Sequence, residues 1–243
     1  MINFLTKRSG LLNWLALGAM IILMGMIFLY APTERTMGYV QRIFYFHVGT
    51  AWVASITFFV ALICGILYLW RRVPVLDIIA MASVEIGVAF VTMTIVSGSI
   101  WGKPAWNTWW IWSPRLTSIT ILWLVYVAYF ILRSSIDNEE IKRRFSAVYT
   151  IAGFVTVILT YSSIRILRDI HPVMFGDALE SAKGAEQGLQ NFSGLDSIRM
   201  VVTLNVAVIA FSILYVAWMA NRIKFEQMRQ KLDAVRMRIL AGE

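Results

Sequence analysis

Residues 45–69 read YFHVGTAWVASITFFVALICGILYL and include no Asp, Glu, Lys or Arg. A helix needs roughly 20 apolar residues to cross the hydrocarbon core of a bilayer, so this stretch is long enough to span a membrane. Only 15% of the 243 residues are charged, whereas about a quarter of the residues in a soluble domain are charged. Five further stretches have the length and apolar character of spans, at 11–31, 75–99, 117–133, 147–165 and 199–220. We therefore predict an all-α integral membrane protein in the form of a six-transmembrane-helix bundle.

Basic residues indicate the orientation of these spans, because Lys and Arg concentrate in the cytoplasmic segments of membrane proteins. When both termini are placed inside, the inner segments carry most of the 22 Lys and Arg residues. We therefore expect an N-in, C-in topology in which 1–220 form the membrane domain and 221–243 form a basic cytoplasmic tail. The basic inner segments account for much of the net charge of +8, so this charge does not indicate a nucleic-acid partner.

Apolar residues recur in the tail at steps of three and four, which predicts a basic helix with one apolar stripe. The stripe consists of Phe225, Met228, Leu232, Val235 and Ile239. Such a helix can lie on the inner face of the membrane or form a coiled coil with a partner. The stripe is short for a coiled coil, so the sequence favours an amphipathic helix on the membrane surface.

Residues 101–112 read WGKPAWNTWWIW, so half of the ten tryptophans fall within one short segment. We expect this segment to be an extracytoplasmic loop between the third and fourth spans. Tryptophan has a broad apolar face and one N–H donor, so single copies favour the edge of a membrane. A cluster in one loop can instead provide an aromatic surface for a planar apolar ligand. Both interpretations, a membrane anchor and a ligand platform, fit the residues alone.

The sequence has only two histidines, His47 and His171, and the expected topology places both near the outer face, together with the tryptophan segment. A neutral imidazole is a common axial ligand of haem iron. Two such imidazoles above an aromatic surface would hold a haem at the membrane edge. Candidates by location to pair with its propionates are Arg42, Arg115, Arg165 and Arg168. The alternative is that each histidine forms ordinary hydrogen bonds at the level of the lipid headgroups.

Glu85 lies well inside the third span, where an ionisable side chain is costly and by default indicates a function. It can serve in proton transfer or in a packed structural contact. The sequence contains no Walker sequence, no H-E-x-x-H motif and no nucleophile elbow. We therefore do not expect the chain to be an enzyme alone, and any energy from nucleotide hydrolysis would come from another subunit.

Three separated segments resemble the motifs of one protein family, and they occur in the family's order. Residues 101–117, WGKPAWNTWWIWSPRLT, resemble the tryptophan-rich WWD signature of haem-handling proteins that serve c-type cytochrome maturation. Residues 42–52, RIFYFHVGTAW, resemble the family segment R-x-x-Y-x-H-V-P. Residues 163–172, SIRILRDIHP, resemble the segment S-V-R-W-W-R-T-L-H-P. In length and number of spans, the chain is most similar to the haem exporter protein C (CcmC) family.

This resemblance implies that His47 and His171 are the axial ligands of the iron of haem b. It implies a frame around the macrocycle formed by Trp101, Trp106, Trp109, Trp110, Trp112 and Arg115, to which we add Arg42 for its expected position. A member of this family would hold haem at the outer face of the bacterial inner membrane and present it to a haem chaperone, CcmE. Its further partners would belong to an ABC-type complex with the ATPase CcmA and the membrane proteins CcmB and CcmD.

The chain departs from the family motifs at several positions. Ser113 stands where the WWD signature has an acid, Asn107 where glycine is usual, and Gly49 where proline follows His-Val.

Two other functions fit the sequence. One is direct ligation of haem to apocytochrome, as in the larger system II synthases, which share the tryptophan signature. The other is a transporter or channel subunit for a small solute, with Glu85 in the translocation route.

Overall fold

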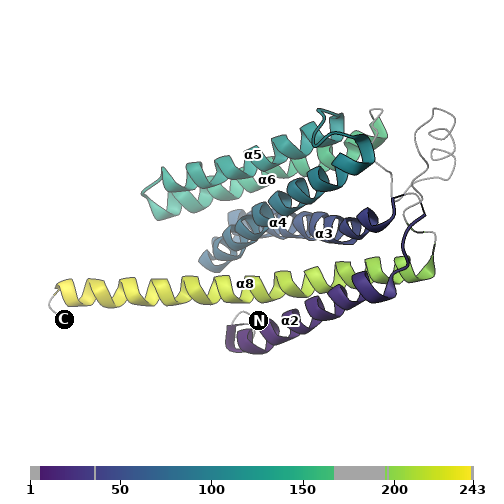
Figure 1. Ribbon diagram of the computed structural model, residues 1–243. Coiled ribbons are helices and arrows are strands. Elements are labelled where there is room, and N and C mark those ends of the chain that lie inside the picture. The colour runs from purple at the N-terminus through teal and green to yellow at the C-terminus, as the bar shows by residue number, and fades with distance from the viewer. Residues whose placement is uncertain (1–5, 36, 167–194, 196, 242–243) are drawn as a thin grey trace.

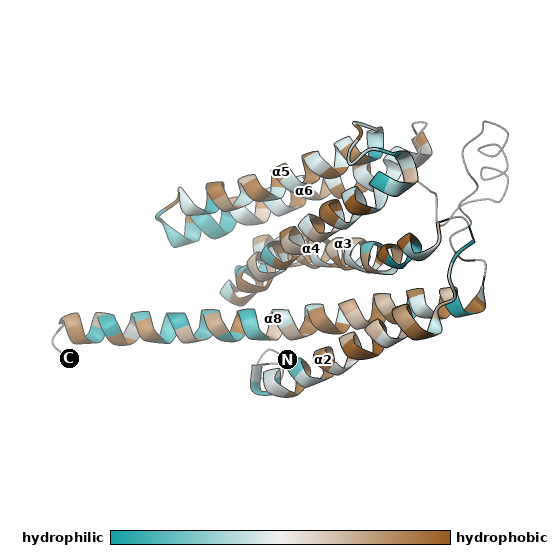
Figure 2. Ribbon diagram, in the orientation of Figure 1, coloured by the Kyte–Doolittle hydropathy of each residue, from teal (hydrophilic) through white to brown (hydrophobic). Residues whose placement is uncertain are grey.

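The computed structural model describes residues 6–35, 37–166, 195 and 197–241, and no β-strand occurs among them. Six helical segments are long and apolar enough to cross a membrane, which confirms the predicted fold class. In Figure 2, hydrophobic residues dominate α2 and the part of α8 beside it, whereas hydrophilic residues alternate with them toward the C-terminal end of α8. The segments comprise α2 (Ser9–Gly25) with the π-helical turn η1 (Met26–Tyr30), the 3-10 turn η2 (Tyr39–Gln41) with α3 (Arg42–Arg71), α4 (Pro74–Trp106), α5 (Pro114–Ser134), α6 (Glu139–Ile166) and α8 (Ile198–Ala241).

The helices are arranged as three packed pairs (Figure 1). α3 and α4 make the most extensive contact and lie in the centre. α8 covers one side of this central pair and carries α2 on its outer side, and α5 and α6 cover the other side. Several large side chains of the central pair, such as Tyr45, Phe58 and Phe90, are consequently fully enclosed by protein.

Glycines let the central helices approach their neighbours closely, as is common where helices pack inside a membrane. A Cβ atom added at Gly87 of α4 would lie 2.5 Å from Oγ1 of Thr57 on α3. A Cβ atom added at Gly65 of α3 would lie 2.6 Å from Oγ1 of Thr150 on α6. Both distances are shorter than van der Waals contact, so a larger residue at either position would push two helices apart.

α4 is longer than its predicted span of 75–99 and reaches Trp106, so Trp101 and Trp106 lie on a helix and not in a loop. The helix ends only before Asn107, whose backbone is left-handed. α6 likewise begins at Glu139, earlier than the predicted start at residue 147. The apolar pattern thus predicts the membrane-crossing part of each helix, but it does not predict the turns that continue beyond that part.

The tail is a continuation of α8 and not a separate helix. α8 runs without interruption from Ile198 to Ala241 and is straight in Figure 1. A tail lying flat on the membrane surface would need a bend near residue 221, and no glycine or proline lies there to favour one. The structure therefore does not support the surface-helix interpretation, while the division of the chain at residue 221 stays a prediction.

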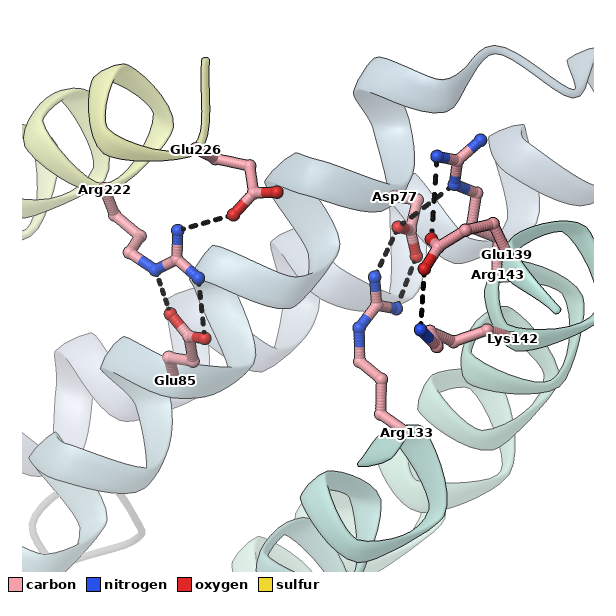
Figure 3. Close-up of polar contacts among 8 residues, drawn as sticks. All are labelled: Asp77, Glu85, Arg133, Glu139, Lys142, Arg143, Arg222 and Glu226. Carbon is pink, nitrogen blue, oxygen red and sulfur yellow. Dashed lines mark hydrogen bonds and ion pairs between the residues drawn. The ribbon is translucent and has the colours of Figure 1, made fainter. Parts of the chain in front are cut away.

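Asp77 of α4 holds three helices together at the end of the bundle opposite the tryptophan segment (Figure 3). Arg133 of α5 donates to both carboxylate oxygens of Asp77, at 2.7 and 2.6 Å. Nε of Arg143 on α6 lies 3.9 Å from the same carboxylate. Asp77 is only 5% exposed, so the two arginines, and not water, compensate its charge.

Glu85, the acid inside the third span, forms an ion pair with Arg222 of α8 (Figure 3). The guanidinium donates from Nε to one carboxylate oxygen and from Nη2 to the other, the second at 3.0 Å. Its Nη1 also lies 3.2 Å from the carboxylate of Glu226, one turn further along α8. This contact links α4 to α8, and it favours a packed structural role of Glu85 over proton transfer.

Replacing Asp77 with Asn should destabilise the bundle more than replacing Glu85 with Gln. Asp77→Asn leaves a buried arginine without its counter-charge, a change that costs on the order of 3–5 kcal/mol in buried ion pairs. The side chain of Glu85 is 34% exposed, so solvent screens the loss in Glu85→Gln. The measurement is the midpoint of thermal unfolding of both variants in the same detergent. An equal or larger decrease for Glu85→Gln would contradict this ranking.

Candidate functional site

A cavity of about 90 Å³ lies between α3, α4, α5 and α6, at the end of the bundle that carries the tryptophan segment. Most of its lining is apolar. Residues singled out from the sequence line it together, namely His47, Trp101, Trp106, Trp110 and Arg115. The structure therefore brings a histidine, three tryptophans and an arginine from separate parts of the chain to one space.

Three other predicted residues, Trp109, Trp112 and Arg42, do not line this cavity. The side chains of Trp109 and Trp112 are 58% and 72% exposed, as expected of membrane anchors. Arg42 lines a separate groove between η1, α3 and α4. His171 lies outside the described residues, as does most of the connection between α6 and α8. Within the tryptophan segment, some indoles thus border the cavity and others are exposed, so both interpretations stay predictions.

His47 lies near the start of α3, and its ring contacts α4. Its Nδ1 is 3.1 Å from Oγ of Ser97, and that Oγ is 2.7 Å from the carbonyl oxygen of Met93. The Ser97 hydroxyl donates its only proton to this carbonyl, so it accepts the hydrogen bond from Nδ1–H of His47. When the Ser97 hydroxyl accepts from Nδ1–H, the imidazole is in the tautomer in which Nε2 carries the lone pair that can bind a metal.

Gly98 follows Ser97 on α4 and lets the imidazole lie against the helix backbone. A Cβ atom added at Gly98 would be 2.8 Å from Cε1 of His47. The position of the imidazole thus depends on a hydroxyl at one residue and on the absence of a side chain at the next. Neither residue is identifiable as functional from the sequence, because a run such as V-S-G-S at 96–99 is ordinary in a membrane helix.

Residues that depart from the family motif set both ends of the connection between α4 and α5. Asn107 has a φ of 57°, a left-handed conformation that favours glycine and that asparagine tolerates. Ser113 caps α5, since its side chain accepts a hydrogen bond from the backbone N–H of Leu116 at 3.4 Å. Serine and aspartate are both favoured at this capping position. Each replacement therefore keeps a backbone role, although Ser113 does not carry the charge of an acid.

The aromatic side of the cavity is built from contacts within the tryptophan segment. The rings of Trp101 and Trp106 meet edge to face, with centroids 5.2 Å apart, an arrangement that aromatic pairs prefer. The hydroxyl of Ser99 donates to the carbonyl oxygen of Trp109 at 2.8 Å. This hydrogen bond folds the connection between α4 and α5 back on α4.

Trp110 and Arg115 each bring a hydrogen-bond donor to the mainly apolar lining of the cavity. Nε1 of Trp110 is buried and has no hydrogen-bond partner among the described residues. The guanidinium of Arg115 lies 4.8 Å from the centre of the Tyr161 ring and donates to the carbonyl oxygen of Thr160. A buried N–H without a partner is costly. The cavity therefore suits a ligand that has a flat apolar body and an anionic or other hydrogen-bond-accepting edge.

Gly98→Ala should displace the imidazole of His47, because the added methyl group would overlap the ring. The chain has only two histidines, so the nitrogen NMR signals of ¹⁵N-histidine-labelled protein report on His47 directly, with His171 as an internal reference. We expect the His47 signals to shift and those of His171 to stay. Gly18→Ala is the matched control, since no atom lies within 4 Å of a Cβ there. Unchanged His47 signals in Gly98→Ala would show that the ring does not rest on Gly98.

Comparisons with known proteins agree with the motifs at this site. A family model described as Heme exporter protein C matches residues 2–238. The chain is 30% identical over 239 residues to Heme exporter protein C of Bradyrhizobium diazoefficiens, an alignment that covers 97% of this chain and 86% of that protein. It is 28% identical over 241 residues to the protein of the same name in Rhodobacter capsulatus, covering 98% and 95%. With Heme exporter protein C of Escherichia coli strain K12 it shares 33% identity over 163 residues, covering 65% and 66%.

Proposed function

Because the chain belongs to the Heme exporter protein C family, we propose that it binds haem b beside His47 and presents it to a haem chaperone. A role in haem handling for cytochrome c biogenesis follows from the family itself. The finer proposal is that His47 and His171 are the axial ligands and that the tryptophans cover the macrocycle. The observation that carries it is the hydrogen bond between His47 at the cavity and Ser97, which supports Nε2 as the coordinating nitrogen.

The lining of the cavity supports a porphyrin ligand on chemical grounds. Haem has a flat apolar body, an iron that binds imidazole, and two propionates. The indoles of Trp101 and Trp106 match the apolar body. The buried N–H of Trp110 and the guanidinium of Arg115 offer donors to a propionate. The chemical groups of the described lining residues therefore match those of haem.

The size of the cavity indicates how a porphyrin would bind. Ligand pockets usually measure roughly 300–1,000 Å³, and this cavity measures about 90 Å³. A porphyrin therefore enters only if the connection that carries Trp109 and Trp112 moves outward, or if one edge of the porphyrin stays outside. Either arrangement leaves an accessible edge, which transfer to a second protein requires.

The position of His171 in the chain supports its assignment to the second axial site. His171 follows the last residue of α6, Ile166, by five residues. Five residues span at most about 18 Å even when fully extended. Thr160 and Tyr161, in the last turns of the same helix, line the cavity. This short spacing along the chain is compatible with a second axial ligand from the segment that follows α6.

The residues of the chain hold and orient the cargo. Bound haem supplies the iron for the two imidazoles and a vinyl edge for covalent capture by the chaperone. The indoles exclude water, and Arg115 orients a propionate. We place this site at the outer face of the bacterial inner membrane. The proposed partners are a CcmE-like chaperone and CcmA-, CcmB- and CcmD-like subunits, of which the ATPase supplies the energy of nucleotide hydrolysis.

His47→Gly tests the axial assignment. Loss of one imidazole should abolish the low-spin absorption spectrum of the purified haem-loaded protein, and added free imidazole should restore it by taking the vacant axial position. His171→Gly should behave in the same way. The measurement is the absorption spectrum in detergent with and without imidazole. Parental haem content and spectrum in His47→Gly without imidazole would exclude His47 as a ligand.

Ser97→Ala tests the orientation of that ligand. Removing the hydrogen-bond partner of a ligating histidine typically weakens metal binding about 10–100-fold, so we expect a loss of haem affinity in this range with the low-spin spectrum retained. Ser212→Ala is the matched control, because its hydroxyl donates to Val208 of its own helix at 2.7 Å and does not border the cavity. Titration of both variants with haem gives the affinities. Parental affinity in Ser97→Ala would remove Ser97 from the site.

A further inference from the structure

A second apolar hollow, a groove of about 640 Å³, lies on the outside of the bundle between η1, the start of α3 and α4. Its apolar lining includes Ile27, Phe28, Phe46, Met93, Val96 and Ile100. Phe28 and Val96 are more than half exposed, so the groove is open to the surroundings of the bundle. Ser97 also lines it, whereas the hydrogen-bond partner of Ser97, His47, lines the cavity.

Arg42 supplies the positive charge of this groove. Its guanidinium lies 5.4 Å from the centre of the Phe28 ring and 4.8 Å from that of the Tyr39 ring. Its Nη2 makes only a long contact, 3.4 Å, with the carbonyl oxygen of Phe28. No acid in the described part of the chain forms an ion pair with Arg42. The guanidinium therefore has the capacity to bind an anion while the two rings hold it in place.

The charge and the apolar surface are arranged along the membrane-crossing direction. The groove follows α4 from Ile100 to Thr92, which corresponds to about 12 Å of helix. α3 and α4 are antiparallel, and His47 meets α4 at Ser97. Arg42 precedes His47 on α3, so it lies beyond Ser97, toward the end of the bundle that carries the tryptophan segment. The guanidinium of Arg42 thus lies at the end of the groove nearest the tryptophan segment, and the apolar residues extend from it along α4 into the membrane.

We propose that this groove is a binding site for an anionic phospholipid. The phosphate pairs with Arg42, and one acyl chain lies along the apolar residues of α4. Charge complementarity selects the anionic headgroup, because Arg42 has no counter-ion among the described residues. The apolar floor selects an amphiphile over a soluble anion, since burying apolar surface favours the acyl chain but not an ion.

The lipid would contact the residues that position His47. Met93 and Ser97 line the groove, and the carbonyl of Met93 holds the Ser97 hydroxyl that accepts from His47. An acyl chain in the groove therefore packs behind this pair of hydrogen bonds and strengthens haem binding. This consequence rests on the proposed function, whereas lipid binding does not.

Selective lipid retention tests the site itself. The protein is purified with equal amounts of phosphatidylglycerol and phosphatidylcholine, and the lipids that remain bound are counted by native mass spectrometry. We expect phosphatidylglycerol to be retained several-fold over phosphatidylcholine, and Arg42→Gln to remove this preference. Arg35→Gln is the matched control, because this exposed arginine precedes the same helix but does not line the groove. Equal retention of both lipids, or an unchanged preference in Arg42→Gln, would overturn the proposal.

Photolabelling locates the bound chain. Phosphatidylglycerol with a diazirine in its acyl chain should label residues 24–28 or 92–100, and Val96→Trp, which fills the groove without changing its charge, should reduce this label. Label on other segments would overturn the proposal, and so would competition by free haem, which would assign the groove to a porphyrin.

Haem affinity then tests the link to His47. If the protein binds haem more tightly in vesicles of phosphatidylglycerol than in vesicles of phosphatidylcholine, and Arg42→Gln removes the difference, the link is supported. Equal affinities in both vesicles would overturn the link alone. Failure of the His47→Gly test would overturn the proposed function and leave the lipid-retention result unaffected.

Discussion

The close contact between α3 and α4 is the constraint on which the rest of the structure depends. A side chain at Gly87 would overlap Thr57 and Phe58, and a side chain at Gly98 would overlap the imidazole of His47. The contact therefore requires glycine at both positions. Only at this separation does the ring of His47 reach the Ser97 hydroxyl. Donation from Nδ1 to this hydroxyl corresponds to the tautomer whose Nε2 can bind a metal, as the proposed function requires. Helix packing and ligand chemistry are therefore set by the same few atoms.

Ion pairs link the outer helix pairs to the central pair α3 and α4, and these ion pairs lie away from the candidate site. Asp77 joins α4 to α5 and α6, and Glu85 joins α4 to α8. At the opposite end, the helices are connected through the tryptophan segment and are separated by the cavity. A bundle that is tied by ion pairs at one end can rearrange at the other end at a lower cost. The proposed binding of a porphyrin would need such a rearrangement, because the cavity is smaller than a porphyrin.

The sequence predicts the membrane spans well, because hydropathy measures transfer into lipid and every span must satisfy that requirement. It also predicts one site formed by His47, His171, the five tryptophans of residues 101–112, Arg115 and Arg42, and of these His47, Trp101, Trp106, Trp110 and Arg115 line the cavity. It does not predict Ser97 or Gly98, since small residues have no distinctive pattern in a membrane helix. It does not separate Arg42 from the cavity either, because hydropathy does not report on which side of a helix pair a residue lies. Nor does it show that Asp77 is more buried than Glu85, because burial depends on the arginines of other helices. The roles of His171 and of the outer connection that contains it stay predictions, as does the N-in, C-in topology.

The most direct test of the central claim is a structure of the haem-loaded protein in a lipid nanodisc, determined by electron cryomicroscopy. The account predicts that Nε2 of His47 coordinates the iron, while Nδ1 keeps its hydrogen bond to Ser97 and the indoles of Trp101 and Trp106 border the porphyrin. A haem bound away from His47, or an iron coordinated through Nδ1 with Ser97 displaced, would contradict it.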